Sequence, residues 1–235
     1  MSDHIAKAYD NDILALKSQL AEMGGIAEEQ LANAIQALAR RDIALADQVI
    51  SNDQKLDELE RRIEEKAILT IAKRQPMALD LREIMVAIRV SSDIERIGDL
   101  AKNTAKRTHA ISEALPRKLS TGLARMGQMA QTQLNQVLNA YAQRNDELGL
   151  AVWRSDEELD SLYNSIFREL LTYMMEDPRN ISLCTHLLFG AKNLERIGDH
   201  TTNIAENIHY LIHGKSIAET RPKKDITAMM RPSED

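Results

Sequence analysis

Apolar residues recur every three or four positions along almost the whole of this 235-residue chain. That spacing places them on one face of an α-helix, so the pattern predicts a helical protein. Three prolines, Pro76, Pro116 and Pro178, interrupt the pattern, and proline ends helices because it has no backbone N–H to donate. We therefore expect helices over about residues 4–39 and 42–73, a third between Pro76 and Pro116, and three more that end near residue 213.

Local signals refine the first two helices. Asp42 is the expected N-cap of the second helix, because its carboxylate can accept a hydrogen bond from the first helical turn. Gly24 and Gly25 interrupt the apolar pattern of the first helix, and they are candidates for a kink there.

The segment Glu95–Asp99, Glu-Arg-Ile-Gly-Asp, occurs again without change at residues 195–199, 100 residues later. The apolar pattern also repeats, at an offset of 103: Met126, Ala130, Leu134, Val137 and Tyr141 match Met23, Ala27, Leu31, Ala34 and Leu38. Such self-similarity is typical of repeated structural units. We therefore predict an all-α protein of two tandem three-helix bundles, residues 1–115 and 116–213, followed by a polar C-terminal tail, residues 214–235.

Composition agrees with a helical protein and narrows the partners. Glycine and proline are sparse, at 9 and 5 residues, and aromatic residues make up 3% of the chain. The net charge is −6 and no basic stripe is present, so nucleic acid is not an expected partner. No apolar run approaches the roughly 20 residues that span a bilayer, so direct membrane insertion is not expected. A single cysteine, Cys184, and the absence of a secretory signal favour a cytoplasmic protein.

Acidic residues spaced four apart occur twice in each predicted unit. Residues four apart share one face of a helix, and two carboxylates there repel each other unless a cation lies between them. The second and third helices of each unit carry these pairs: Asp53 and Asp57, Glu95 and Asp99, Asp156 and Asp160, and Glu195 and Asp199.

The proline turns indicate which pairs meet. Asp57 and Glu95 each lie 19 residues from Pro76, so an antiparallel hairpin at that proline places them at equal height. The same reasoning places Asp53 opposite Asp99, and it groups the four carboxylates of the second unit around Pro178 in the same way. Helical-wheel angles direct the carboxylates away from the apolar face, so we expect a surface groove between two helices of each unit.

Four carboxylates in one groove suit a hard or borderline cation, such as magnesium, calcium, manganese, iron or zinc. Carboxylate ligands alone do not select among these ions. The alternative is that the four pairs are ordinary solvated acidic faces, with Arg96 and Arg196 relieving part of the repulsion. Four pairs at equivalent heights, one of them in an identical repeat, favour the metal site.

These motifs resemble the PhoU family of regulators attached to the high-affinity bacterial phosphate transport system. The resemblance covers about residues 5–213 and is most specific in the Glu-Arg-Ile-Gly-Asp repeats, the segment 74–82 (Arg-Gln-Pro-Met-Ala-Leu-Asp-Leu-Arg) and residues 193–195. It implies a fold of two three-helix bundles that bind metal ions at Glu/Asp-x-x-x-Asp motifs on the bundle surface. The motif match carries that role to Asp53, Asp57, Glu95, Asp99, Asp156, Asp160, Glu195 and Asp199, with iron, zinc, magnesium or manganese as the expected ions.

The resemblance also implies a function without catalysis. A PhoU-like protein is a negative regulator of phosphate-starvation signalling and phosphate uptake. It contacts the ATPase subunit of the phosphate transporter and the phosphate sensor histidine kinase when phosphate is plentiful. The resemblance further implies a homodimer in the cytoplasm, held peripherally at the inner membrane face through its partners.

Two other functions remain open on the sequence. The first is a carboxylate-bridged di-iron enzyme of the ferritin-like kind, which needs Glu-x-x-His motifs that point inward. Glu206-x-x-His209 is the one useful match, because its counterpart in the first unit begins with Lys106. The second is a helical interaction module that works without metal. Its regulation would survive the loss of all eight carboxylates.

Overall fold

The computed structural model describes residues 2–111 and 117–219, and the side chains of residues 9–111 and 119–219. Within these residues every regular element is helical. The elements are α1 (Ser2–Arg40), α2 (Ile43–Asn52), α3 (Gln54–Arg74), α4 (Leu79–Arg107), η1 (Thr108–Ala110), α5 (Arg117–Gln143), α6 (Asp146–Glu176), η2 (Pro178–Asn180) and α7 (Ile181–His213). The predicted all-α fold of two tandem three-helix units is confirmed.

One predicted helix is divided in two. The helix expected over residues 42–73 consists of α2 followed by α3, together called the α2–α3 arm, and Asp53 lies between them. The Asp53 carbonyl accepts a hydrogen bond from the Leu56 N–H three residues on, at 2.9 Å, and a longer one from the Asp57 N–H four residues on, at 3.4 Å, so the helix is tightened at this residue. Helix α1 continues through Gly24 and Gly25, the two candidates for a kink, so neither glycine ends the helix.

The helix ends follow the local sequence. The Asp42 carboxylate accepts a hydrogen bond from the Leu45 N–H at 3.0 Å, which confirms the predicted N-cap. Asn145 caps α6 in the same way through the Leu148 N–H, at 3.1 Å. Pro76 lies between α3 and α4, and Pro178 lies just after α6, as expected. Pro116, the boundary between residues 115 and 116, and tail residues 220–235 lie outside the described residues.

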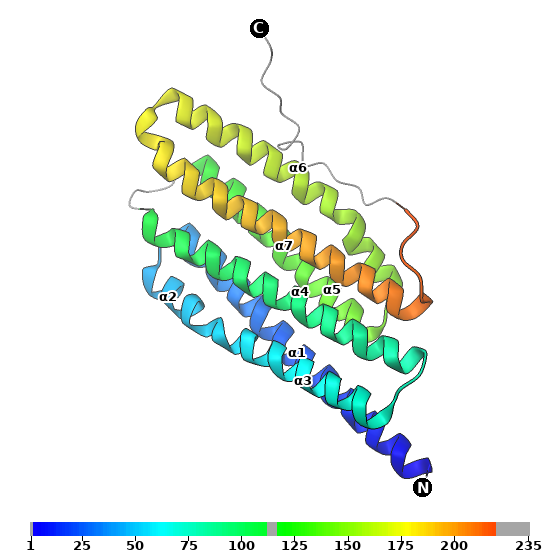
Figure 1. The fold of residues 1–235 in the computed structure, drawn as a ribbon. Coiled ribbons are helices and arrows are strands. Elements are labelled where there is room, and N and C mark those ends of the chain that lie inside the picture. Colours follow the sequence, from blue (N-terminus) through cyan, green and yellow to red (C-terminus); the bar gives the residue numbers. More distant parts are fainter. Residues whose placement is uncertain (1, 112–116, 220–235) are drawn as a thin grey trace.

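The two units pack side by side through α4 and α7, which run antiparallel along the middle of the molecule (Figure 1). Helix α1 also contacts α5, so two helices of each unit form the boundary between the units. The α3–α4 turn therefore lies at one end of the molecule and the α6–α7 turn lies at the other (Figure 1).

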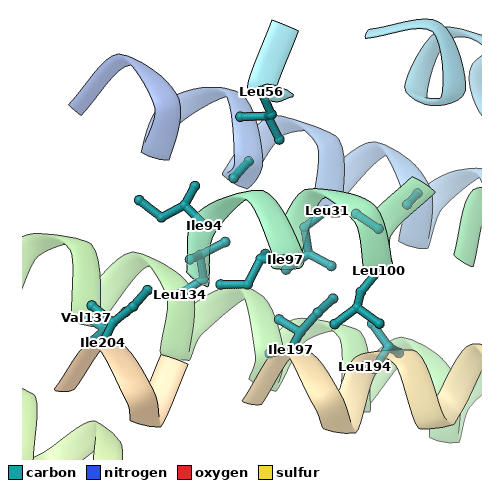
Figure 2. Packing of buried hydrophobic residues seen from close by; sticks show 14 of the residues in the cluster. Leu31, Leu56, Ile94, Ile97, Leu100, Leu134, Val137, Leu194, Ile197 and Ile204 are labelled. Atoms are coloured by element: carbon teal, nitrogen blue, oxygen red, sulfur yellow. The ribbon is translucent and has the colours of Figure 1, made fainter. Parts of the chain in front are cut away.

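A single hydrophobic core runs through both units. Residues of α4, such as Ile97 and Leu100, lie among side chains from α1, α3, α5 and α7 (Figure 2). The predicted apolar stripes account for much of this core. Fully buried side chains include Met23, Leu31, Met126 and Leu134 of the repeated pattern, and also Leu56, Ile63, Ile84, Ile94 and Leu159. The units are thus repeats in sequence that share one apolar interior.

Polar contacts also join the units. The Asp93 carboxylate of α4 accepts a hydrogen bond from Asn203 Nδ2 of α7 at 3.2 Å and lies 3.0 Å from His200 Nδ1. At the end of α7, the Arg82 guanidinium donates to the Leu211 carbonyl at 3.4 Å and lies over the Tyr210 ring. None of the helices in the described part of the chain is long and apolar enough to cross a membrane.

Candidate functional site

The first acidic cluster forms where α3 packs against α4. The pKa of Glu95 is raised, mainly by burial and further by the negative charges of Asp99, Glu60 and Asp57. The pKa of Asp53 is also raised by burial and by Asp99 and Asp57, although a hydrogen bond from Lys102 opposes the shift. The structure therefore brings together the four carboxylates of the first unit that equal distances from Pro76 predict to lie opposite one another.

A lysine lies inside this first cluster. The Lys102 ammonium donates hydrogen bonds to Asp53 and, at 2.6 Å, to Asp99. Arg96 contributes more distant contacts, 3.5 Å to Glu95 and 3.7 Å to Asp99. The repulsion between the carboxylates is thus relieved by side-chain cations of the chain itself.

The second acidic cluster, between α6 and α7, is more deeply buried. Asp156 is 1%, Asp160 2% and Glu195 4% exposed. The pKa of Glu195 is raised to about 7, mainly by burial and also by the charges of Asp199 and Asp160, against the lowering effect of Lys192. The Lys192 ammonium lies 2.9 Å from the Glu195 carboxylate. Glu195 is therefore poised between its neutral and ionised forms near neutral pH.

The predicted position of the carboxylates at a surface groove is wrong for part of the set. Asp53, Asp156, Asp160 and Glu195 are buried, whereas Asp57 is exposed and Glu95, Asp99 and Asp199 are partly exposed. A helical wheel treats each helix alone and takes no account of how closely its neighbour approaches.

Glycine explains this close approach. A Cβ on Gly198 would lie 2.5 Å from Leu159 Cδ2 and 2.6 Å from Asp156 Oδ1. A Cβ on Gly98 would overlap Leu56 Cδ1 in the same manner. The glycine of each Glu-Arg-Ile-Gly-Asp repeat thus leaves room for side chains of the neighbouring helix, Leu56 in the first unit and Leu159 and Asp156 in the second.

Sequence reasoning missed four residues of these clusters. Gln30 and Gln133 are buried side chains beneath Gly98 and Gly198, with Oε1 3.1 and 3.3 Å from where a Cβ would stand. Neither the Gln30 amide nitrogen nor its oxygen has a hydrogen-bond partner. Lys102 follows Asp99 by three residues and Lys192 precedes Glu195 by three, so helical i, i+3 spacing was the available signal for both.

The carboxylates converge without closing around one point. Among the described residues, no three of these eight carboxylates bring ligand atoms within 4.8 Å of one another. The donor set is all oxygen, which suits hard cations. Each cluster therefore carries negative charge and one contact with a partly buried lysine. Each also contains a glutamate whose raised pKa favours its protonated form, Glu95 in the first and Glu195 in the second.

The histidines near the repeats have other partners. His200, which follows Asp99's counterpart Asp199, pairs with Asp93 of the other unit. The Glu206 carboxylate accepts a hydrogen bond from Trp153 Nε1 at 3.0 Å, so it is engaged away from the acidic clusters. The inward Glu-x-x-His arrangement of a di-iron centre receives no support from these contacts.

The fold and its clusters define a class: an all-helical protein of two repeated units, each with an acidic cluster on its second and third helices. The sequence pattern of the PhoU domain matches residues 20–108 and again residues 123–208. The chain therefore belongs to the PhoU family.

Relatives match over nearly the full length. The phosphate-specific transport system accessory protein PhoU homolog of Rhizobium meliloti is 55% identical over 97% of this chain and 96% of its own. The protein of the same name from Caulobacter vibrioides is 50% identical over 96% of this chain and 99% of its own.

Solved structures agree with the fold. The crystal structure of PhoU from Pseudomonas aeruginosa has a TM-score of 0.85 and 37% sequence identity, covering 88% of this chain and 100% of that one. The phosphate transport system regulatory protein PhoU from Streptococcus pneumoniae has a TM-score of 0.83 and 26% identity, covering 90% of this chain and 100% of that one.

Proposed function

We propose that this protein is a regulatory accessory protein of a phosphate-specific transport system. In this role it restrains phosphate uptake and phosphate-starvation signalling when phosphate is plentiful. It does so in the cytoplasm as a homodimer, by contact with the transporter ATPase and the sensor histidine kinase. Family membership over nearly the whole chain and the names of its relatives support this role.

One structural observation carries the proposal: an apolar tip at the α3–α4 turn. The tip comprises exposed apolar side chains on the end of α3, the turn and the start of α4, namely Ile68, Leu69, Met77, Leu79, Leu81 and Met85. Met77 is 81% exposed and Leu79 is 65% exposed. Several exposed apolar side chains at one turn are typical of a protein-docking site.

The backbone of the tip supports the same interpretation. Gln75 and Ala78 both have positive φ angles, 50° and 47°, although neither is glycine. Such conformations cost about 1–3 kcal/mol each, and they persist where the surrounding structure holds them in place. A turn held in this way presents Met77 and Leu79 in a fixed arrangement.

The test replaces Met77 and Leu79 together by serine in a bacterium whose own copy has been deleted. With ample phosphate, the wild-type protein should keep a phosphate-starvation reporter off, and the double variant should leave it on. Binding of the purified variant to the purified transporter ATPase should fall in parallel.

Ile43→Ser is the matched control, because Ile43 is 52% exposed and begins the α2–α3 arm at the end far from the tip. Repression by the double variant equal to that by Ile43→Ser would contradict docking through the tip. Light scattering of the wild-type protein in solution tests the homodimer separately.

We also propose that the acidic clusters bind metal, and the fit differs between them. The second cluster has buried carboxylates and a Glu195 whose pKa is about 7, so a bound cation would neutralise charge that the fold otherwise holds at a cost. The first cluster already contains the Lys102 ammonium, which a metal ion would have to displace. The second cluster also holds a lysine, Lys192, 2.9 Å from Glu195, so a metal ion has to compete with an ammonium in either cluster. The deeper burial of its carboxylates makes the second cluster the better candidate for a cation. Such a cation would supply positive charge between α6 and α7.

Elemental analysis of untagged protein tests this part. The comparison is between wild type and a variant with Glu95, Asp99, Glu195 and Asp199 changed to alanine, after exposure to iron, zinc, manganese and magnesium. Bound metal that is lost in the variant supports the sites. Equal metal content in both proteins would refute metal binding at the acidic clusters. If the four-alanine variant still represses the reporter, regulation does not depend on metal.

A further inference from the structure

A group of three metal-ligand side chains lies outside both acidic clusters, where α6 begins and α7 ends. His209 Nδ1 is 3.0 Å from Asp146 Oδ1 and 3.3 Å from Oδ2. His213 Nε2 is 2.8 Å from Asp146 Oδ2. One atom from each of the three residues lies within 4.8 Å of the others, and in the described part of the chain no other trio of histidine, cysteine or acidic residues does so.

Helix geometry holds these residues in place. Asp146 is the first residue of α6, directly after the N-cap Asn145. His209 and His213 are four residues apart near the end of α7, so both imidazoles project from one face, with ring centroids 4.5 Å apart. The two helices are packed along their length, which fixes the carboxylate against the imidazoles.

The local charge favours a cation. The end of α7 carries the negative end of its helix dipole, and Glu147 adds a second acidic residue beside Asp146, against the positive end of the α6 dipole in that first turn. The side chain of His213 is 40% exposed, and those of His209 and Asp146 are partly exposed. An ion can therefore enter from solvent, and water can complete its coordination.

The pairing differs from the other histidine–carboxylate contacts of the described chain. His109 pairs with Asp47, and His200 pairs with Asp93, so each of those carboxylates faces one imidazole. Among the residues that the structure describes, Asp146 is the one carboxylate that faces two imidazoles. A helix-end hydrogen bond needs one histidine, whereas two imidazole nitrogens and a carboxylate oxygen form a ligand set for a transition metal.

We propose that Asp146, His209 and His213 form a binding site for a divalent transition metal of the zinc type. Two nitrogen donors and one oxygen donor suit zinc, cobalt or iron(II) and are poor ligands for magnesium. In a tetrahedral site with bonds of about 2.1 Å, ligand atoms are about 3.4 Å apart, so small side-chain movements complete the arrangement. The first unit has no counterpart of this site, because the residue that matches Asp146 at the repeat offset of 103 is Ile43.

The test is titration of the full-length, untagged, metal-depleted protein with zinc chloride in a large excess of magnesium, followed by calorimetry. Wild type should bind zinc at this site, and His209→Gln/His213→Gln should lose that binding. Asp146→Asn should weaken it by at least the roughly 10- to 100-fold that loss of a supporting partner of a metal ligand costs. Equal zinc affinity in wild type and the double-histidine variant would overturn the proposal.

Two controls separate this site from others. His109→Gln removes an imidazole that also faces a carboxylate, and it should leave zinc affinity unchanged. The variant with alanine at Glu195 and Asp199 should also retain zinc, whether or not the acidic clusters bind metal. If zinc binding follows Glu195 and Asp199 instead, the His209 site is refuted.

A measurement on the wild-type protein tests the site even if the variants do not fold. Crystals of the wild-type protein soaked in zinc should give an anomalous difference peak at bonding distance from His209 Nδ1 and His213 Nε2. A map at the zinc edge without that peak would overturn the proposal.

Discussion

The Lys102 ammonium contacts the Asp53 carboxylate at the place where the sequence predicted a metal ion. Asp53 is buried and Lys102 is about one-fifth exposed, so this contact is largely shielded from water. Burial lowers the pKa of Lys102, but the hydrogen bonds that its ammonium donates to Asp53 and Asp99 outweigh this effect, so the pKa is raised and the ammonium is held charged. Thr202 occupies the matching position in the second unit, so the two clusters differ in their internal cation.

Lys102→Thr should make the first cluster resemble the second. In the presence of a chelator we expect the free energy of unfolding to fall by about 1–3 kcal/mol, because Asp53 stays buried without its cation. Without a chelator, affinity of the first cluster for divalent metal should rise, since no ammonium competes. Urea denaturation and metal titration measure the two effects.

Lys106→Thr is the control, because Lys106 is an exposed lysine on the same helix. It should change stability by less than about 0.5 kcal/mol. If Lys102→Thr is no more destabilising than Lys106→Thr, the Lys102–Asp53 contact contributes nothing to the fold.

Gly198→Ala should destabilise the second unit. The new methyl group would stand 2.5 Å from Leu159 Cδ2 and 2.6 Å from Asp156 Oδ1, so these buried side chains, or α6 with them, have to shift. Overpacking of this kind costs about 1–3 kcal/mol. Thermal and urea unfolding measure the loss, and α6 displacement should increase solvent access to Asp156.

Gly25→Ala makes the same chemical change on an exposed part of α1, where nothing lies within 4 Å of the added carbon. It should be neutral or stabilise the protein by up to about 1 kcal/mol, because alanine favours helix. A Gly198→Ala protein as stable as Gly25→Ala would show that the close approach of α6 is not required.

The sequence predicts the fold well because the fold depends on patterns that are local. The three- and four-residue spacing, the Asp42 cap and the breaks at Pro76 and Pro178 each act within one or two helical turns. The repeat then shows that the pattern occurs twice. The break at Asp53 has no such local signal.

The acidic clusters were predicted only in part, for a different physical reason. Two residues at the same distance in sequence from a helical turn lie opposite each other, so counting residues was enough to place Asp57 near Glu95 correctly. Burial of Asp156 depends on how far α6 moves toward the bare backbone of Gly198, which a helical wheel cannot represent. The meeting of Asp146 with His209 depends on the packing of residues 63 positions apart.

The stability of the metal-free protein should depend on the titration of Glu195. Its pKa is about 7 in the folded protein and near 4.5 when unfolded, so the folded state binds the proton more tightly. Between these values the folded state holds more protons, and the free energy of unfolding falls as the pH rises. As the pH rises from below 4.5 to above 7, Glu195 therefore lowers the free energy of unfolding by about 3 kcal/mol in total.

Glu195→Gln should remove this part of the pH dependence. Urea denaturation at intervals from pH 4.5 to 8, with a chelator present, should give a flatter profile for the variant than for wild type. Glu158→Gln, an exposed change on α6, should follow the wild-type profile. Parallel profiles for wild type and Glu195→Gln would mean that Glu195 does not titrate in this window.

Asp93→Ala tests the polar contact between the units. Asp93 faces both His200 and Asn203 of α7, and its removal leaves two partly buried polar groups without their acceptor. We expect a loss of about 1–3 kcal/mol in the free energy of unfolding. Unfolding should remain a single transition, because the apolar core shared by α4 and α7 still couples the units.

Asp47→Ala is the matched change, because Asp47 faces His109 at the same 3.0 Å but on the exposed surface. Exposed pairs contribute about 0–1 kcal/mol, so this variant should stay close to wild type. Calorimetry of both variants measures the difference. If Asp93→Ala instead separates unfolding into two transitions, the contact at Asp93, rather than the shared core, is what makes the two repeats unfold as one.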